Sequence, residues 1–421
     1  MKEKITNLFK NAHFLRLWGS QAFSQTTAYL LNFVLMLRIY QQTGLTTALS
    51  IFLLVYTAPS VLLGLFAGAL IDHWSKKRIL LLSNLYQAGV VLLYLLVGQE
   101  VIWPLYLIVF LYSLGDEFFS PAQGAYIPSL VPKDHLPLAN SFFMFTAQGA
   151  IILGPWVGGV LIKIFPFWFP YILAFLLLMI GVLFVRLLPK DEPRKKKTAK
   201  KLKIRFQELI GEIIEGYSFI RAKPRVYYSF WFYLLAQIII VSVIILIPSL
   251  TGQILRTELI DTGSAVLLPA GLGAFVGTWY VTISLKKWGR KVLIAFGWLL
   301  SGFCLLGLGI LVSKLAIGWG VLFLVGIGAV LVILPSLTMI QENTPKKIRG
   351  RVFGSLNALM VISAYLPVLF LGVLADWLGT RFTLSLLGMI MIIVGGLSLK
   401  VDRKLILSAK GASNNKRDKL K

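Results

Sequence analysis

The sequence predicts an all-α integral membrane protein whose twelve transmembrane helices form two six-helix bundles. Hydrophobic residues make up 57% of the 421 positions and charged residues only 14%, against about 45–50% and 25% in soluble domains. Apolar stretches long enough for a membrane crossing recur along the chain. Several short patterns also occur twice, which indicates an internal repeat.

Uninterrupted apolar stretches mark the expected crossings. The first six lie near 14–40, 46–71, 79–98, 102–128, 141–163 and 166–188, and the second six near 227–250, 263–285, 291–313, 315–340, 353–375 and 380–399. Because twelve is even, both termini lie on one side. Of 42 Lys and Arg residues, 37 fall at the termini and in alternate loops, which leaves Arg38, Lys163, Arg256, Lys314 and Arg381 opposite. The positive-inside rule therefore places both termini in the cytoplasm, with the chain in the inner membrane.

The net charge of +25 does not indicate a nucleic-acid partner. The charge lies in the predicted cytoplasmic loops, where it faces anionic lipid, and no basic patch interleaved with aromatic residues accompanies it. Protons, membrane lipids and a small-molecule solute are the expected partners.

Residues that support catalysis or cofactor binding are missing from the sequence. Cys304 is the only cysteine, and His13, His73 and His135 are too scattered for a metal site. No Gly-Lys dipeptide occurs, which excludes a phosphate-binding loop of the Walker type. We therefore expect no catalytic residue, no metal and no cofactor, and a protein that is not an enzyme.

Charge and hydropathy divide the chain into four parts. These are a first bundle at 1–189, a basic cytoplasmic linker at 190–226, a second bundle at 227–400 and a basic cytoplasmic tail at 401–421, which is expected to be disordered. Within the linker, apolar residues recur at helical spacing: Phe206, Leu209, Ile210, Ile213, Ile214 and Tyr217. They predict an amphipathic helix that lies either on the membrane surface or on the ends of other helices.

Repeated motifs relate the two bundles. Trp74-Ser75-Lys76-Lys77-Arg78 follows the second expected helix and Trp288-Gly289-Arg290-Lys291 follows the eighth. Pro121 and Pro335 lie at the same separation inside the fourth and tenth helices. Two similar bundles that move against each other around a central site are typical of transporters.

Four motifs resemble those of the major facilitator superfamily. The run Gly68-Ala69-Leu70-Ile71-Asp72-His73-Trp74-Ser75-Lys76-Lys77-Arg78 resembles its signature between helices two and three, although His73 and Ser75 replace the usual Arg and Gly. Gly154-Pro155-Trp156-Val157-Gly158-Gly159 is similar to an element of exporters, and Ser120-Pro121-Ala122 with Arg349-Gly350-Arg351 resembles the branch of macrolide and enterobactin exporters. Lysophospholipid transporters share much of the helix-four pattern. The resemblance implies the major facilitator fold and a drug:proton antiporter that works as a monomer.

The resemblance also implies roles for two groups of residues. A conformational latch is expected in which Asp72 docks on the other half near a helix N-terminus, supported by Gly68, Lys76, Lys77 and Arg78; the alternative is a solvated loop carboxylate. Gly154, Pro155, Gly158 and Gly159 are expected to form a helix-packing export motif, because small side chains let a neighbouring helix approach closely.

Polar residues at helical spacing mark the expected substrate cavity. They are Gln21, Gln25, Tyr29 and Asn32 on helix one, Tyr112, Asp116, Ser120 and Gln123 on helix four, and Tyr233 and Gln237 on helix seven. The resemblance places these helices around a central cavity. Its mostly apolar and aromatic character suits a lipophilic or amphipathic solute, while interhelical hydrogen bonding is the alternative role for the amides.

Two acidic residues, Asp116 and Glu117, lie deep within a predicted crossing. A carboxylate there costs a few kcal/mol on insertion scales, so it is expected to be functional, paired or protonated. Asp116 shares the polar stripe of its helix and is the first candidate for proton coupling, whereas Glu117 is expected to contact a neighbouring helix or a cationic solute. The alternative is that both are neutral and join helices by hydrogen bonds.

These observations predict a secondary active transporter. We expect it to export a hydrophobic or amphipathic small molecule by proton antiport with alternating access. A lysophospholipid transporter or flippase is the first alternative. A non-transporting membrane receptor or scaffold is the second.

Overall fold

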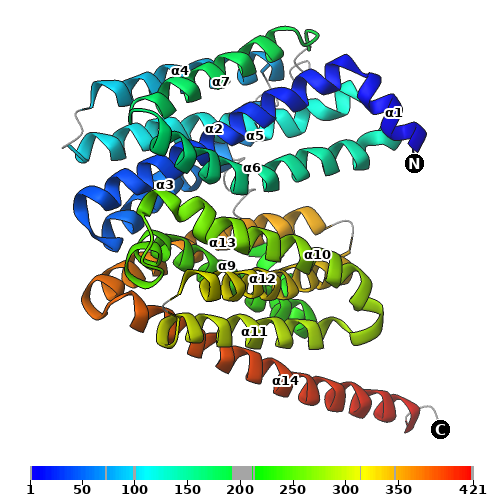
Figure 1. Ribbon diagram of the computed structural model, residues 1–421. Helices are drawn as coiled ribbons and strands as arrows, with labels where there is room; N and C mark the ends of the chain where they lie inside the picture. The colour runs from blue at the N-terminus through cyan, green and yellow to red at the C-terminus, as the bar shows by residue number, and fades with distance from the viewer. Residues whose placement is uncertain are drawn as a thin grey trace. The chain divides into compact units, whose positions relative to one another are not determined.

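The computed structural model describes residues 2–71, 74–97, 101–191, 211, 214–312, 314–345 and 348–418, and these residues are predominantly helical (Figure 1). The helices before the linker are α1 (Lys2–Lys10), α2 (Ala12–Thr43), α3 (Thr46–Ile71), α4 (Lys76–Leu93), α5 (Trp103–Leu130), α6 (Leu136–Ile164) and α7 (Phe169–Arg186). Those after it are α9 (Pro224–Ser249), α10 (Leu268–Trp288), α11 (Arg290–Ile310), α12 (Leu315–Asn343), α13 (Arg349–Leu378) and α14 (Thr380–Asp418). Each apolar stretch predicted from the sequence overlaps one of these helices, beginning with α2.

Nine helical stretches of the described residues are long and apolar enough to cross a membrane. Neither α2 nor α5 is among them, and α13 contributes only a shorter apolar stretch, Pro367–Leu378. The polar stripes of α2 and α5 lower their hydropathy, which is expected of helices that line a polar interior. The structure therefore supports a multi-pass membrane protein, while twelve crossings and cytoplasmic termini stay predictions.

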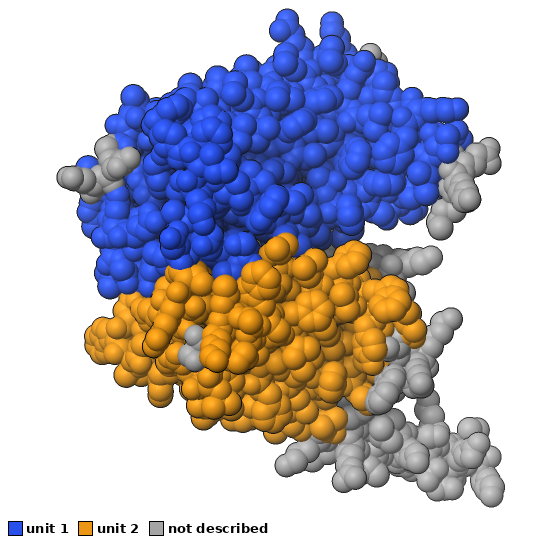
Figure 2. All heavy atoms as spheres, viewed as in Figure 1, with its two compact units in different colours: residues 1–213, 258–267 blue, residues 214–257, 268–421 orange. Residues whose placement is uncertain are grey.

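Contacts divide the chain into two compact units. One comprises Met1–Ile213 with Glu258–Leu267, and the other comprises Ile214–Thr257 with Leu268–Lys421 (Figure 2). The predicted bundle limits at 189 and 227 stay a prediction. The segment Glu258–Leu267 stands between α9 and α10 in the sequence, yet it packs on α6 of the first unit.

Four helix pairings of the first unit recur in the second. In the first unit α2 packs on α6, α3 on α5, and α4 on both α5 and α7. In the second unit α9 packs on α13, α10 on α12, and α11 on both α12 and α14. Pairings that follow the same order along each half of the chain agree with the repeat in the sequence.

Local sequence explains where the helices begin and end. Asn11 caps α2 by accepting hydrogen bonds from the backbone N–H groups of His13 and Phe14 at 3.0 and 3.1 Å. Proline occupies the first turn of α5, α6, α7 and α9, where its missing N–H has no helical partner to lose. Gly44 ends α2 with φ of 65°, the left-handed conformation that glycine adopts without strain.

The tail at 401–421 and the linker helix are two polar segments whose predictions can be compared with the structure. Helix α14 continues to Asp418, so the expectation of a disordered tail at 401–421 is wrong for most of its length. Its sequence after Leu399 has no proline and several good helix formers, which favour continuation. Of the amphipathic pattern in the linker, Ile214 and Tyr217 lie in a helical stretch at 214–222, and Phe206, Leu209, Ile210 and Ile213 lie outside the described residues.

Candidate functional site: a polar network in the first unit

Asp116 of α5 lies at the centre of hydrogen bonds that join three helices. The hydroxyl of Tyr56 on α3 donates to its Oδ2 at 3.0 Å, and Nε2 of Gln87 on α4 donates to its Oδ1 at 2.8 Å. Gln87 lies directly against α5, because a Cβ added to Gly115 would meet its Cγ at 2.5 Å. Gly115 therefore makes room for the amide that reaches Asp116.

The network extends from Asp116 in two directions. A side-chain hydrogen bond joins Tyr56 to Asn32 on α2, one of the residues predicted to line the cavity. Another joins Ser60 to Glu117. Because Tyr56 and Ser60 are four residues apart, they lie on the same face of α3 and receive the two adjacent carboxyl groups of α5. Asp116 and Glu117 thus have different partners, as their roughly 100° separation around the helix requires.

This arrangement suits a group that gains and loses a proton. Each oxygen of Asp116 accepts one hydrogen bond, which satisfies the carboxylate without a basic side chain. After protonation the carboxyl group must donate, and a tyrosine hydroxyl can rotate to accept whereas the amide NH₂ of Gln87 cannot. Rotation of the Tyr56 hydroxyl therefore accommodates both protonation states of Asp116 with the helices in place.

The polar residues predicted for the cavity occupy different surroundings. Tyr112 is buried, with 3% of its surface exposed, and its hydroxyl has no hydrogen-bond partner in the described part of the chain. Gln21 is also buried and donates to the carbonyl of Phe143 on α6 at 3.1 Å. Gln123 is buried, Gln25 and Tyr29 are partly exposed, and Ser120 is exposed. Tyr233 and Gln237 are partly exposed on α9 of the second unit.

The glycines of the predicted export motif pack against backbone. A Cβ on Gly154 would come within 2.8 Å of the backbone nitrogen of Leu30 on α2. A Cβ on Gly159 would come within 2.6 Å of the carbonyl oxygen of Ile260. This face of α6 therefore receives both α2 and the segment Glu258–Leu267. A 3.5 Å ion pair between Lys163 and Asp261 joins the same two elements.

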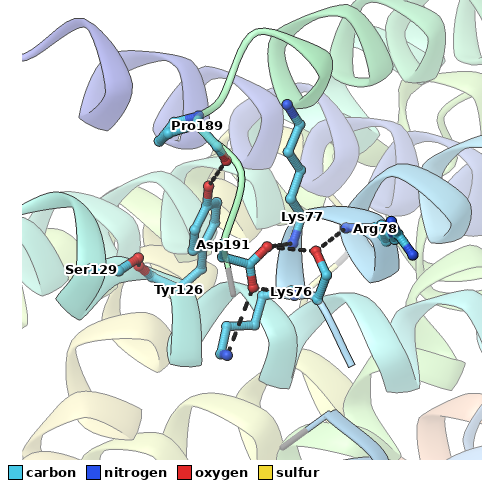
Figure 3. Close-up of polar contacts among 8 residues, drawn as sticks. Lys76, Lys77, Arg78, Tyr126, Ser129, Pro189 and Asp191 are labelled. Atoms are coloured by element: carbon cyan, nitrogen blue, oxygen red, sulfur yellow. Dashed lines mark hydrogen bonds and ion pairs between the residues drawn. The ribbon is translucent and has the colours of Figure 1, made fainter. Parts of the chain in front are cut away.

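The predicted latch region contains a contact that the sequence does not predict. Asp72 lies outside the described residues, and Gly68 lies within α3. At the start of α4, the carboxylate of Asp191 accepts hydrogen bonds from the backbone N–H groups of Lys76 and Lys77 at 2.6 and 3.1 Å, and from the hydroxyl of Ser75 at 2.5 Å (Figure 3). Asp191, which follows α7 in the sequence, therefore caps the N-terminus of α4.

Further contacts hold the Asp191 segment in place. Lys77 Nζ donates to the carbonyl of Arg186 at 2.8 Å and to that of Leu188. The Tyr126 hydroxyl donates to the carbonyl of Pro189 at 2.5 Å (Figure 3). Burial by itself raises the pKa of Asp191. The hydrogen bonds from Ser75, Lys76 and Lys77, with the charge of Lys76, outweigh burial and hold that pKa below its ordinary value.

Sequence reasoning missed four residues of this site: Tyr56, Ser60, Gln87 and Asp191. The four-residue spacing of Tyr56 and Ser60 within an apolar stretch is a signal that could have identified the α3 face. Gln87 follows Asn84 by three residues in α4, a helical spacing that could have marked a polar face of that helix. Asp191 stands in a charged run and carries no local pattern.

Comparison with known proteins supplies a family and several relatives. A family model described as the Major Facilitator Superfamily matches residues 17–367. An uncharacterized MFS-type transporter of Bacillus subtilis, YfiS, is 26% identical over 410 residues, which span 93% of this chain and 94% of that protein. The enterobactin exporter EntS of Shigella boydii is 25% identical over 86% of this chain and 83% of its own length. Macrolide efflux protein A of Streptococcus pyogenes is 27% identical over 36% of this chain and 38% of its own length.

Solved structures of low sequence identity share the fold. A peptide transporter of the POT family superposes with a TM-score of 0.74 at 16% identity and covers 93% of this chain and 94% of its own. A bacterial homologue of the human lysosomal transporter Spinster, solved facing inward and unoccupied, gives 0.72 at 12% identity over 93% and 96%.

Proposed function

Because the chain belongs to the Major Facilitator Superfamily, we propose that it exports a hydrophobic or amphipathic small molecule by proton antiport. Membership confirms the family resemblance, the assignment as a transporter rather than an enzyme, and the location as a multi-pass protein of the inner membrane. Its relatives include efflux proteins, so export of a small molecule is the direction that we propose.

One observation supports proton coupling most strongly. The carboxylate of Asp116 lies between two neutral donors, Tyr56 and Gln87, within a helix bundle. A carboxyl group in such a place changes charge when it binds a proton, and its neighbours can satisfy either form. Asp116 is therefore our proton-binding residue, and Asn32 connects it through Tyr56 to the polar face of α2.

The character of the solute follows from the residues around this network. The polar groups near Asp116 are mainly tyrosine hydroxyls and amides, and among the described residues no basic side chain takes part in its hydrogen bonds. Aromatic rings with a few hydrogen-bonding groups favour lipophilic or amphipathic solutes over sugars or multiply charged anions. We propose that the buried hydroxyl of Tyr112 contacts this solute, because it is a polar atom without a partner among the described residues.

Alternating access is the mechanism that we propose for the two units. Protonation of Asp116 and binding of the solute would compete, so that each stabilises a different state of the transporter. The export motif and Asp72 are proposed to control the change between these states. The macrolide and siderophore exporters among the relatives give the first solutes to test.

The deciding experiment uses purified full-length protein in liposomes with an imposed pH gradient. Dyes, macrolides, siderophores and lysolipids are tested for uphill movement that a protonophore stops. Asp116→Asn should abolish uphill movement while downhill exchange continues, and Asp134→Asn, which changes an exposed carboxylate just after α5, should not. Normal uphill transport by the Asp116→Asn, Glu117→Gln double variant would rule out this coupling site. Lysolipid movement that persists with the protonophore would favour a flippase.

A further inference from the structure

Two adjoining pockets open on the first unit where α4 begins. The first has a volume of about 610 Å³ and is lined by Trp74, Lys77, Arg78, Lys190 and Asp191, among others. The second has a volume of about 440 Å³ and is lined by residues of α3, α4 and α5. Trp74 and Leu82 line both, so a basic pocket continues into an apolar groove.

Among its described lining residues, the basic pocket carries an excess of positive charge. Three cationic side chains face one carboxylate, that of Asp191, whose oxygens accept hydrogen bonds from Ser75 and from the first turn of α4. The ammonium of Lys77 donates to the backbone carbonyls of Arg186, at the end of α7, and of Leu188. Arg78 and Lys190 are exposed at the pocket. A phosphate group matches this setting, because the guanidinium fork and an ammonium both bind phosphate oxygens.

The groove has the opposite character. Its lining includes Leu63, Ile79, Leu114 and Phe118 from three helices. Leu82, at the junction, is 56% exposed. An exposed apolar groove between helices of a membrane protein suits an acyl chain. Trp74, 53% exposed, stands where the basic and apolar parts meet, as tryptophan does at membrane interfaces.

We propose that the two pockets together bind one anionic phospholipid. Its phosphate lies on Arg78 and Lys190, and an acyl chain follows the groove between α4 and α5. A soluble phosphate would leave the groove empty, and a lipid without net charge would leave the excess positive charge uncompensated. The predicted topology places this end of α4 at the cytoplasmic leaflet, where anionic lipids gather. The proposal does not depend on which solute is transported.

The test measures contact between Trp74 and lipid. Full-length protein is placed in phosphatidylcholine vesicles with a minor fraction of phosphatidylglycerol, and bromine atoms, which quench tryptophan, are carried on the acyl chains of one lipid or the other. The contribution of Trp74 is the difference from the Trp74→Phe variant. Brominated phosphatidylglycerol should quench Trp74 several-fold more than its share of the lipid predicts.

Charge variants decide whether the pocket causes this enrichment. The Arg78→Gln, Lys190→Gln double variant should lower it at least about fivefold, since each basic residue near the surface adds a comparable factor. The Arg221→Gln, Lys223→Gln variant removes the same charge from exposed positions of the second unit and should leave the enrichment intact. Enrichment that survives the first variant, or falls equally in both, would overturn the proposal. Complete competition by soluble glycerophosphoglycerol would also overturn it, because the headgroup alone would then be the ligand.

Discussion

The two units join equivalent helices by different means. In the first, side chains bridge α3, α4 and α5 through Tyr56, Gln87 and Asp116. At the separation that relates Pro121 to Pro335, the corresponding residues of the second unit are Ala270, Ser301 and Val330. The position of Tyr112 corresponds to that of Gly326, which packs against the backbone of Ala270.

The difference indicates how the duplicated fold divides its tasks. Glycine contacts also join α11 to α14, since a Cβ on Gly302 would come within 2.9 Å of the Gly388 carbonyl oxygen. Packing of this kind stabilises membrane helices but contains nothing that titrates. The hydrogen-bonded unit contains the carboxyl group of Asp116. Proton coupling is therefore expected to reside in the first unit.

The largest effect is expected where the second unit packs backbone on backbone. A Cβ on Gly326 would come within 2.9 Å of the backbone nitrogen of Ala274, as well as contacting Ala270, so Gly326→Leu forces α10 and α12 apart. Overpacking costs about 1–3 kcal/mol and sometimes more, and here no flexible side chain can yield. We expect a strong fall in folded, monodisperse protein on gel filtration.

Gly320→Leu provides the matched control on the same helix. A Cβ there meets no atom within 4 Å, so this variant should elute and unfold like the parent protein. If both leucine variants were equally stable, the contrast between the two units would not hold.

The next effect concerns the hydrogen bond from Tyr56 to Asp116. Tyr56→Phe removes the one partner that can donate or accept as the carboxyl group changes state. Hydrogen bonds to charged groups contribute about 1.5–3 kcal/mol, so coupled transport should slow roughly tenfold or more. The dependence of uphill transport on pH should change as well, measured in liposomes across a range of pH values.

Tyr106→Phe is the control for this variant. Its hydroxyl donates to the backbone carbonyl of Ala48, outside the Asp116 network. This variant should keep the parent pH profile. If Tyr56→Phe left the pH profile of uphill transport unchanged, Tyr56 would not have the role that we assign to it beside Asp116.

A smaller effect is expected at the capped end of α4. Asp191→Asn keeps one acceptor oxygen but loses the charge that faces the first turn of the helix. Loss of a helix cap costs about 1 kcal/mol, which lowers the melting temperature by about 2–4 °C in a domain of this size. Thermal unfolding in detergent at neutral pH measures this change.

The difference in melting temperature between the parent protein and Asp191→Asn should depend on pH, because the pKa of Asp191 is lowered. A carboxyl group with a depressed pKa in the folded state stabilises the fold when the pH is above its pKa in the unfolded chain, near 3.9. This stabilisation is lost as the pH falls through the pKa of the folded state. Parent and variant should therefore differ at neutral pH and converge below about pH 4. A difference that grows on acidification would contradict the assignment.

Much of the fold could be predicted from the sequence because the bilayer restricts it strongly. Crossing helices must be long and apolar, so hydropathy located α3, α9 and α12 closely, and the repeat related Pro121 to Pro335. Asp116 also stood out, since a carboxylate within an apolar stretch is rare. The hydrogen-bond partners of Asp116 did not stand out, because Tyr56 lies 60 residues away from it and no local pattern pairs the two residues.

The same limit applies to contacts made by loops. Asp191 reaches the backbone of Lys76 across 115 residues, and only the packing of α4 on α7 brings them together. The segment Glu258–Leu267 precedes α10 but packs on α6, which hydropathy cannot reveal. Helix α14 passed its predicted end because the membrane limits the apolar stretch and not the helix.

The smallest effect is expected at the loop of the second unit that corresponds to the capped end of α4. There the guanidinium of Arg290, at the start of α11, makes paired hydrogen bonds to Glu342 of α12, including one of 2.6 Å from Nη2 to Oε1. The two side chains are 34% and 51% exposed, and ion pairs this exposed contribute about 0–1 kcal/mol. Glu342→Gln should therefore lower the melting temperature less than Asp191→Asn does. High salt should screen most of its effect, whereas Asp191, with 8% of its side chain exposed and backbone donors on both oxygens, should keep most of its contribution. Thermal unfolding of both variants at low and high salt measures the contrast. An equal loss of both contributions in salt would mean that the two repeat-related loops are stabilised in the same way.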